Sequence, residues 1–135
     1  MTKLLSIAAI TMGLLAFTSC ENDEGKLPNI SLKTGGTYTS ADATLAGSTP
    51  LLIGIKASKS ETEDVLKQFN ISKSINGGAN TSIFSKSLSG SDCDNYAYDM
   101  STTVDTAHGQ VSKYTFTVTN RDGLTNQVAV TVTTQ

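Results

Sequence analysis

The chain has 135 residues, and its 10 basic and 12 acidic side chains give it a formal net charge of −2 at neutral pH. Proteins that bind nucleic acids through phosphates usually present a stripe of lysines and arginines. This sequence contains no such run, and Arg121 is its only arginine, so no nucleic-acid partner is expected.

The first element along the chain is an export signal. Lys3 supplies a positive charge ahead of the apolar run Leu4–Phe17. This run is shorter than the roughly twenty residues that a membrane-spanning helix needs. The pattern therefore predicts a signal peptide over residues 1–19.

The signal ends in two small residues, Thr18 and Ser19, directly before Cys20. This ending resembles the lipobox of bacterial lipoproteins, in which the signal is cut before the cysteine and the cysteine is then acylated. The resemblance implies lipidation of Cys20 and attachment to a membrane through the lipid. An ordinary secretory signal followed by an unmodified cysteine is the alternative, and a Cys20–Cys93 disulfide requires that alternative.

A short acidic tether, residues 20–27, follows the signal. Glu21, Asp23 and Glu24 lie directly after the cysteine. Here the chain resembles surface lipoproteins of the Bacteroidota, in which acidic residues at this place act as an export signal. The resemblance implies a lipid-anchored protein of the outer membrane that faces the extracellular side. The alternative is a solvated tether that has no signalling role.

From Pro28 onward, apolar and polar residues alternate with the period of two that is typical of strands. We expect strands, in chain order, over residues 29–33, 38–45, 51–58, 69–75, 81–88, 96–104, 114–119 and 128–133. Gly54 lies at an outward position and indicates a bulge or the close approach of another backbone. Glu61–Lys67 is the one helical candidate, and because it is short we expect a turn or loop there.

Two hairpin signals complete the pattern. Asn76-Gly77-Gly78 supplies glycines for a tight turn, and Asn120–Gly123 joins the last two strands. With no alternating helices, the chain is predicted to be all-β, an antiparallel two-sheet sandwich of about seven strands over residues 28–135. The last hairpin and the Asn76–Gly78 turn resemble those of small Ig-like and PKD-like surface lipoproteins of Bacteroidota. This resemblance implies an Ig-like fold and a cell-surface location, and no defined activity.

Residues suited to catalysis are sparse. His108 is the only histidine and lies in a polar loop, and Cys93 is the only thiol left if Cys20 is acylated. Nucleophilic catalysis needs a nucleophile and a base within hydrogen-bond reach, and no motif predicts such a pair. We therefore expect no enzyme activity and no cofactor, with a buried, inert Cys93.

Asp92, Asp94, Asn95 and Asp99 form the densest group of oxygen ligands in the sequence. Calcium accepts six to eight oxygens, which makes these residues a weak calcium candidate. They lack the central glycine and terminal glutamate of an EF-hand loop. Solvated loop carboxylates are the favoured interpretation, and no metal is expected.

Three tyrosines are candidates for ligand contact. Tyr96 and Tyr98 lie two apart on one strand and so share a face, and Tyr38 lies elsewhere. Facing outward, such rings could stack on a sugar; facing inward, they belong to the core, which is the favoured alternative. The function expected is a non-catalytic binding or interaction module, serving in glycan capture, adhesion or an envelope complex, with a glycan or another surface protein as partner. A structural spacer or subunit of a surface assembly is the alternative.

Overall fold

The computed structural model describes residues 25–135. Cys20 and the acidic residues through Glu24 lie outside this part of the chain. Eight strands are formed: β1 (Asn29–Leu32), β2 (Ala43–Leu45), β3 (Pro50–Ser58), β4 (Leu66–Ile75), β5 (Thr81–Ser87), β6 (Asn95–Thr103), β7 (Val111–Asn120) and β8 (Thr125–Thr134). A 3-10 turn, η1 (Gly90–Cys93), precedes β6.

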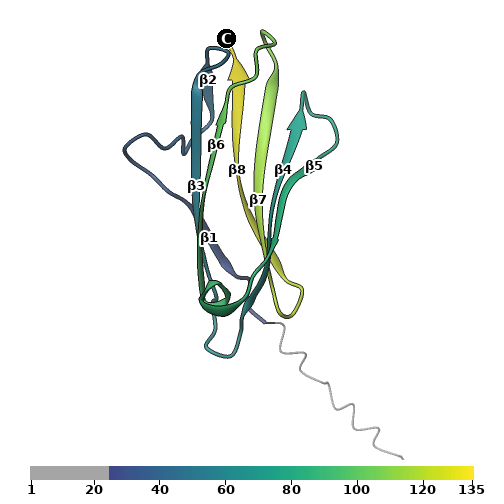
Figure 1. Ribbon diagram of the computed structural model, residues 1–135. Coiled ribbons are helices and arrows are strands. Elements are labelled where there is room, and N and C mark those ends of the chain that lie inside the picture. Colours follow the sequence, from purple (N-terminus) through teal and green to yellow (C-terminus); the bar gives the residue numbers. More distant parts are fainter. Residues whose placement is uncertain (1–24) are drawn as a thin grey trace, which may run out of the picture.

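The strands form two sheets, one in the order β1-β3-β6 and the other in the order β2-β8-β7-β4-β5. The predicted all-β, two-sheet sandwich is therefore confirmed. The described chain enters at one end of the sandwich, and the C-terminus lies at the other end (Figure 1). No helix within residues 25–135 is long and apolar enough to cross a membrane.

One pairing departs from the antiparallel expectation, because β2 pairs with β8 in parallel. The stretch 38–45 was expected to be one strand, yet only its last three residues are β2. The reason is that this stretch changes sheets. The Thr39 N–H donates to the Leu52 carbonyl on β3 at 2.8 Å, and the chain then crosses to β8 in the other sheet.

The core lies between the sheets and follows the period of two. On β7, Phe116 and Val118 are fully buried, and Phe69 on β4 is fully buried opposite Val118. The Phe69 ring lies 5.1 Å from that of Tyr96, which comes from the other sheet. Burial of these apolar side chains on both inner faces is the main force that holds the sheets together.

A buried polar cluster closes the end at which the chain enters. The Asp64 carboxylate is only 2% exposed and accepts hydrogen bonds from the Val65 N–H and the Asn120 side-chain amide, both at 2.8 Å. The Asn120 side-chain oxygen also accepts the N–H groups of Asp122 and Leu124, which shapes the turn between β7 and β8. Asn120 thus joins two loops that are distant in the sequence.

The helical candidate, 61–67, contains no helix. Its first half is a turn, in which the Asp64 N–H donates to the Glu61 carbonyl, and β4 begins at Leu66. The expectation of a turn or loop is confirmed for this half. The second half pairs as a strand because the Leu66 side chain is fully buried in the core.

Candidate functional site

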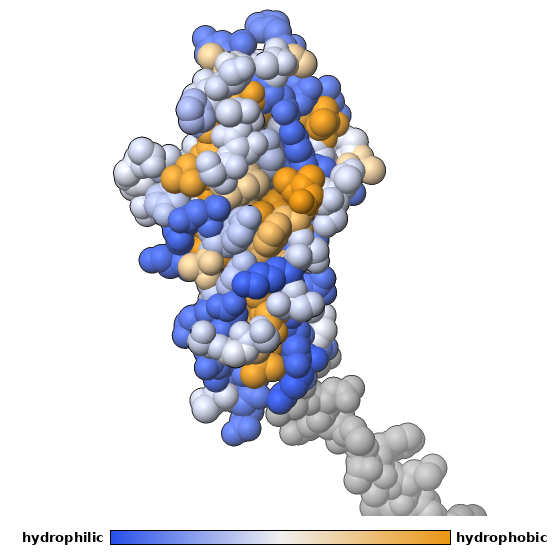
Figure 2. All heavy atoms as spheres, viewed as in Figure 1, coloured by the Kyte–Doolittle hydropathy of each residue, from blue (hydrophilic) through white to orange (hydrophobic). Residues whose placement is uncertain are grey.

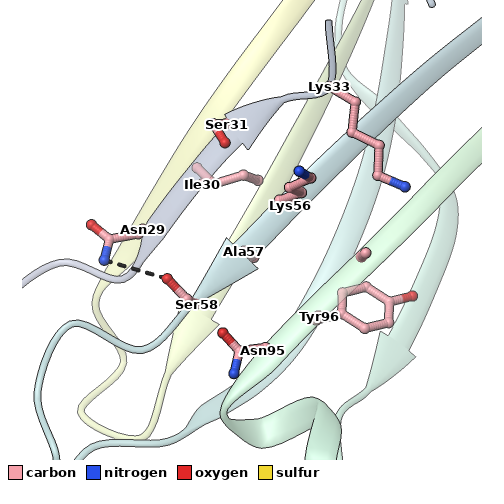
Figure 3. A pocket seen from close by; sticks show the side chains of 10 residues that line it. Asn29, Ile30, Ser31, Lys33, Lys56, Ala57, Ser58, Asn95 and Tyr96 are labelled. Carbon is pink, nitrogen blue, oxygen red and sulfur yellow. Dashed lines mark hydrogen bonds between the residues drawn. The ribbon is translucent and has the colours of Figure 1, made fainter.

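A hollow that contains two lysines lies on the outer face of the three-stranded sheet. It has a volume of about 490 Å³ and is lined by Asn29, Ile30, Ser31, Lys33, Lys56, Ala57, Ser58, Asn95, Tyr96 and Ala97. Figure 3 shows that these residues come from β1, β3 and β6 and the segment that follows β1. We call this hollow the outer groove.

Strand register explains why the groove is hollow. Lys56 on β3 lies opposite Ser31 on β1 and opposite Ala97 on β6. Both neighbours are small, so the Lys56 side chain rises from the sheet with open space on either side. The next row consists of Asn29, Ser58 and Asn95, and Asn29 donates a long hydrogen bond of 3.5 Å to the Ser58 hydroxyl.

Gly54 lies two residues before Lys56 on β3. A Cβ atom at this position would lie 2.6–2.7 Å from side-chain atoms of Tyr38, Asp99 and Lys33. The close approach expected at Gly54 therefore exists, but it is made by three side chains and not by another backbone. Because glycine leaves this space empty, the three side chains converge above β3.

These three side chains form a charged cluster. The Lys33 ammonium lies 2.6 Å from Asp99 Oδ1, and the Tyr38 hydroxyl donates to Asp99 Oδ2 at 3.1 Å. The hydrogen bond from Lys33 is the main reason that the pKa of the Asp99 carboxyl lies below its usual value. The same hydrogen bond raises the pKa of Lys33, so the pair stays ionised, and mutually neutralised, at neutral pH.

Lys56 differs from Lys33 in having no ion pair within residues 25–135. A second hollow of about 430 Å³ adjoins the outer groove and shares Ser31, Lys33 and Lys56 with it. The Lys56 ammonium is therefore reachable from both hollows. Neither lining includes a carboxylate, so the groove presents uncompensated positive charge.

Another hollow, of about 330 Å³, lies between the edge strands β5 and β6. Its lining mixes apolar side chains such as Ile83, Phe84 and Met100 with polar ones, and the Phe84 ring stacks on Tyr98 at 4.7 Å. Figure 2 shows apolar residues dispersed along the visible face and not gathered in one broad patch. The outer groove is the better candidate because it combines a hollow with unpaired charge.

The structure separates the three tyrosines that were candidates for ligand contact. Tyr96 and Tyr98 share the inner face, where both rings pack against Phe69; Tyr96 is 6% exposed and also borders the outer groove. Burial raises the pKa of the Tyr96 hydroxyl. Tyr38 lies on the outer face of the same sheet, where it contacts Asp99.

The four residues of the weak calcium candidate do not converge. Asp92 pairs with Lys86, Asp94 with Lys59, and Asp99 with Lys33. Within residues 25–135, no three histidine, cysteine or acidic side chains lie close enough together to hold one metal ion. Asn95 lines the outer groove instead.

Cys93 and His108 lie at opposite ends of the sandwich. Cys93 ends η1, His108 lies exposed in the loop after β6, and the nine residues of β6 run between them. A strand of that length spans about 30 Å, so the two side chains form no thiol–imidazole pair. Cys93 is half-buried, not fully buried as expected, and its sulfur lies 3.6 Å from the Leu88 carbonyl.

Sequence reasoning missed the outer groove. One signal was available, because Lys56 occupies an outward position in the alternating stretch 51–58. What makes the groove, however, is the register that places Ser31 and Ala97 beside Lys56. Those neighbours come from distant parts of the chain. The predicted lipidation residue Cys20 and the export-signal residues 21–24 lie outside residues 25–135.

Comparison with known proteins identifies a fold and no family. No protein-family model matches the sequence, and no curated protein matches it. Similar solved structures include the superoxide reductase (neelaredoxin) from Ignicoccus hospitalis and a single-substitution variant of that protein. The first is 6% identical with a TM-score of 0.49, and the match covers 82% of this chain and 81% of that one. The variant is 5% identical with a TM-score of 0.50, and the match covers 81% and 80%.

This comparison corrects the expected function. The expectation of a non-catalytic binding or interaction module, with a structural spacer as its alternative, came from the predicted surface location and the lack of a catalytic motif in the sequence. The variant structure, which shares the fold with a TM-score of 0.50, is instead named as a superoxide reductase, so the sandwich gives no support for that role. At 5% identity the likeness shows the fold alone, and it assigns no activity to this chain.

Proposed function

We propose that this chain is an exported protein that a lipid on Cys20 holds at the outer membrane, with its β-sandwich facing the outside of the cell. The observation that carries the proposal is the apolar run that ends in Thr18-Ser19-Cys20. A thiol at this place provides the atom to which a diacylglyceryl group is attached. The two small residues before it suit cleavage by a signal peptidase.

The way in which the chain enters the sandwich supports a short attachment. The carbonyl oxygens of Lys26 and Pro28 accept hydrogen bonds from Asn120 and Asn126, at 3.2 and 3.0 Å. The chain is therefore tied to the domain from residue 26 onward. Four residues separate Cys20 from Gly25, and a fully extended chain covers the five steps between them in at most about 18 Å.

A tether of this length would hold one end of the domain close to the membrane. The end that carries the turn at 60–64, η1 and the β7–β8 turn would lie next to the membrane, and the C-terminal end would point away (Figure 1). Each buried acyl CH₂ contributes about 0.8 kcal/mol of membrane affinity, and two chains give stable attachment. No membrane-spanning helix is needed for such an anchor.

Incorporation of labelled palmitate tests the attachment. Cys20→Ala should abolish the label, while Cys93→Ala, which removes the other cysteine, should retain it. Label that persists in Cys20→Ala, or that disappears only in Cys93→Ala, contradicts the proposal.

A second experiment tests the side of the membrane. An epitope placed after Gln135 lies at the end of the sandwich away from the anchor and should bind antibody on intact cells. Replacing Glu21, Asp23 and Glu24 by Gln, Asn and Gln should leave palmitate labelling intact while removing the epitope from the surface. An epitope that is reached only after the outer membrane is breached contradicts outward display.

A further inference from the structure

We propose that the outer groove binds a phosphate group, with the Lys56 ammonium as its main contact. The site is distinct from the lipid anchor and does not depend on it. A phosphate group matches the charge, the hydrogen-bond donors and the size of the groove.

Charge is the first reason. The ten residues that line the groove include two lysines and no acidic residue, although the whole chain carries a net charge of −2. Lys33 is neutralised by Asp99, which lies just outside the groove. Lys56 is left with its charge uncompensated among residues 25–135. A dianion or monoanion would supply the missing partner.

The neighbours of Lys56 are the second reason. Opposite charges on directly paired strand positions attract each other, so a carboxylate at position 31 or 97 would pair with Lys56. The chain has Ser31 and Ala97 at these positions. Lys113, on the outer face of the other sheet, also has no ion pair within residues 25–135 and also lies between small residues, Ser74 and Thr131. It lines none of the described hollows and is therefore a matched control.

The remaining donors complete the site. Asn95 contributes an amide that makes no hydrogen bond to any other described side chain, and the Ser31 and Ser58 hydroxyls line the same groove. Lysine binds phosphate as a point charge, and neutral N–H and O–H donors can satisfy the remaining phosphate oxygens. A groove of about 490 Å³ holds a phosphate together with part of the molecule that carries it.

Two sources of phosphate suit this position. The groove begins at Asn29, close to the point at which the chain would leave the membrane, so a lipid headgroup is one source. A soluble phosphate ester is the other. The chemistry recognised is the same, and the experiment separates the two.

The experiment uses the full chain, purified as the cell makes it in neutral detergent, with backbone amide shifts followed by NMR. Inorganic phosphate should give saturable shifts at Ser31, Lys56 and Asn95. Lys56→Gln should weaken the binding by at least about tenfold, the loss expected for one charge-assisted hydrogen bond. Ala97→Asp should weaken it as strongly, because the new carboxylate occupies Lys56. Lys113→Gln should change it by less than about twofold.

A second arm identifies the source. Micelles doped with phosphatidylglycerol, with phosphatidylcholine as the zwitterionic control, should reproduce the same shifts if the headgroup is the ligand. Phosphate binding without this response assigns the groove to a soluble ester. The proposal is overturned if neither probe gives saturable shifts at these amides. It is also overturned if Lys113→Gln weakens binding as much as Lys56→Gln.

Discussion

Phe116 and Thr117 are adjacent on β7, and their side chains point to opposite faces of the sheet. The Phe116 side chain is fully buried between the sheets, with its ring 6.4 Å from that of Phe69. Thr117 points outward, and its hydroxyl makes only a long hydrogen bond of 3.4 Å to Gln127. Phe116→Ala should cost about 3–5 kcal/mol, because it removes the transfer energy of the ring and leaves a cavity. Thr117→Ala should cost less than about 1 kcal/mol.

Thermal unfolding of the full chain, followed by circular dichroism, measures the difference. For a domain of this size, Phe116→Ala should lower the Tm by about 12–20 °C, and Thr117→Ala should lower it by no more than about 4 °C. If Phe116→Ala does not fold, Phe116→Leu should fold and still lose more stability than Thr117→Ala. Similar losses from both positions would refute the assignment of the inner and outer faces.

Three further changes probe other parts of the sandwich. Asn120→Ala should cost about 2–3 kcal/mol in urea unfolding, because it leaves the buried Asp64 carboxylate short of a donor; a cost below about 0.5 kcal/mol would contradict the role of this cluster. The hydrogen bond from Lys73 is the main cause that lowers the pKa of Asp105, so the contribution of Asp105 is present above its unfolded pKa of about 3.9 and is lost as pH falls through the lower folded value. Asp105→Asn should therefore be less stable than the native chain at pH 7, with a gap that closes in acid; a gap independent of pH would refute this reasoning. Cys93→Ser should leave palmitate labelling and phosphate binding unchanged, and loss of either would assign this thiol a role that its half-buried place in η1 does not indicate.

Much of the fold follows from local pattern. The alternation in 114–119 and 128–133 predicts β7 and β8 because each apolar residue there enters the core, and the glycines after Asn76 predict the turn between β4 and β5. The parallel pairing of β2 with β8 is not predictable in this way. It arises because the segment before β2 runs beside β3 as far as Thr39 and then crosses to the other sheet. The alternation of apolar and polar residues does not indicate such a crossing.

Local sequence pattern predicts the candidate site less well than it predicts the fold. Asp92, Asp94 and Asp99 are close together in the sequence, and sequence spacing alone suggested one cluster. In the fold each of them forms an ion pair with a lysine from a different segment, so the three carboxylates do not share one site. Lys56 shows the opposite effect, since its small neighbours Ser31 and Ala97 become visible only when three strands are placed in register. Long-range register decides which polar side chains share a site.

The proposed location depends on one covalent modification, and the mass of the mature protein decides whether it is present. Native protein extracted from the outer membrane should begin at Cys20, and its N-terminal peptide should carry a diacylglyceryl thioether together with an acylated amino group. Cys20→Ala should yield no such peptide. A mature chain that begins elsewhere, or that carries an unmodified Cys20 thiol or a Cys20–Cys93 disulfide, would contradict the lipid anchor and the orientation derived from it.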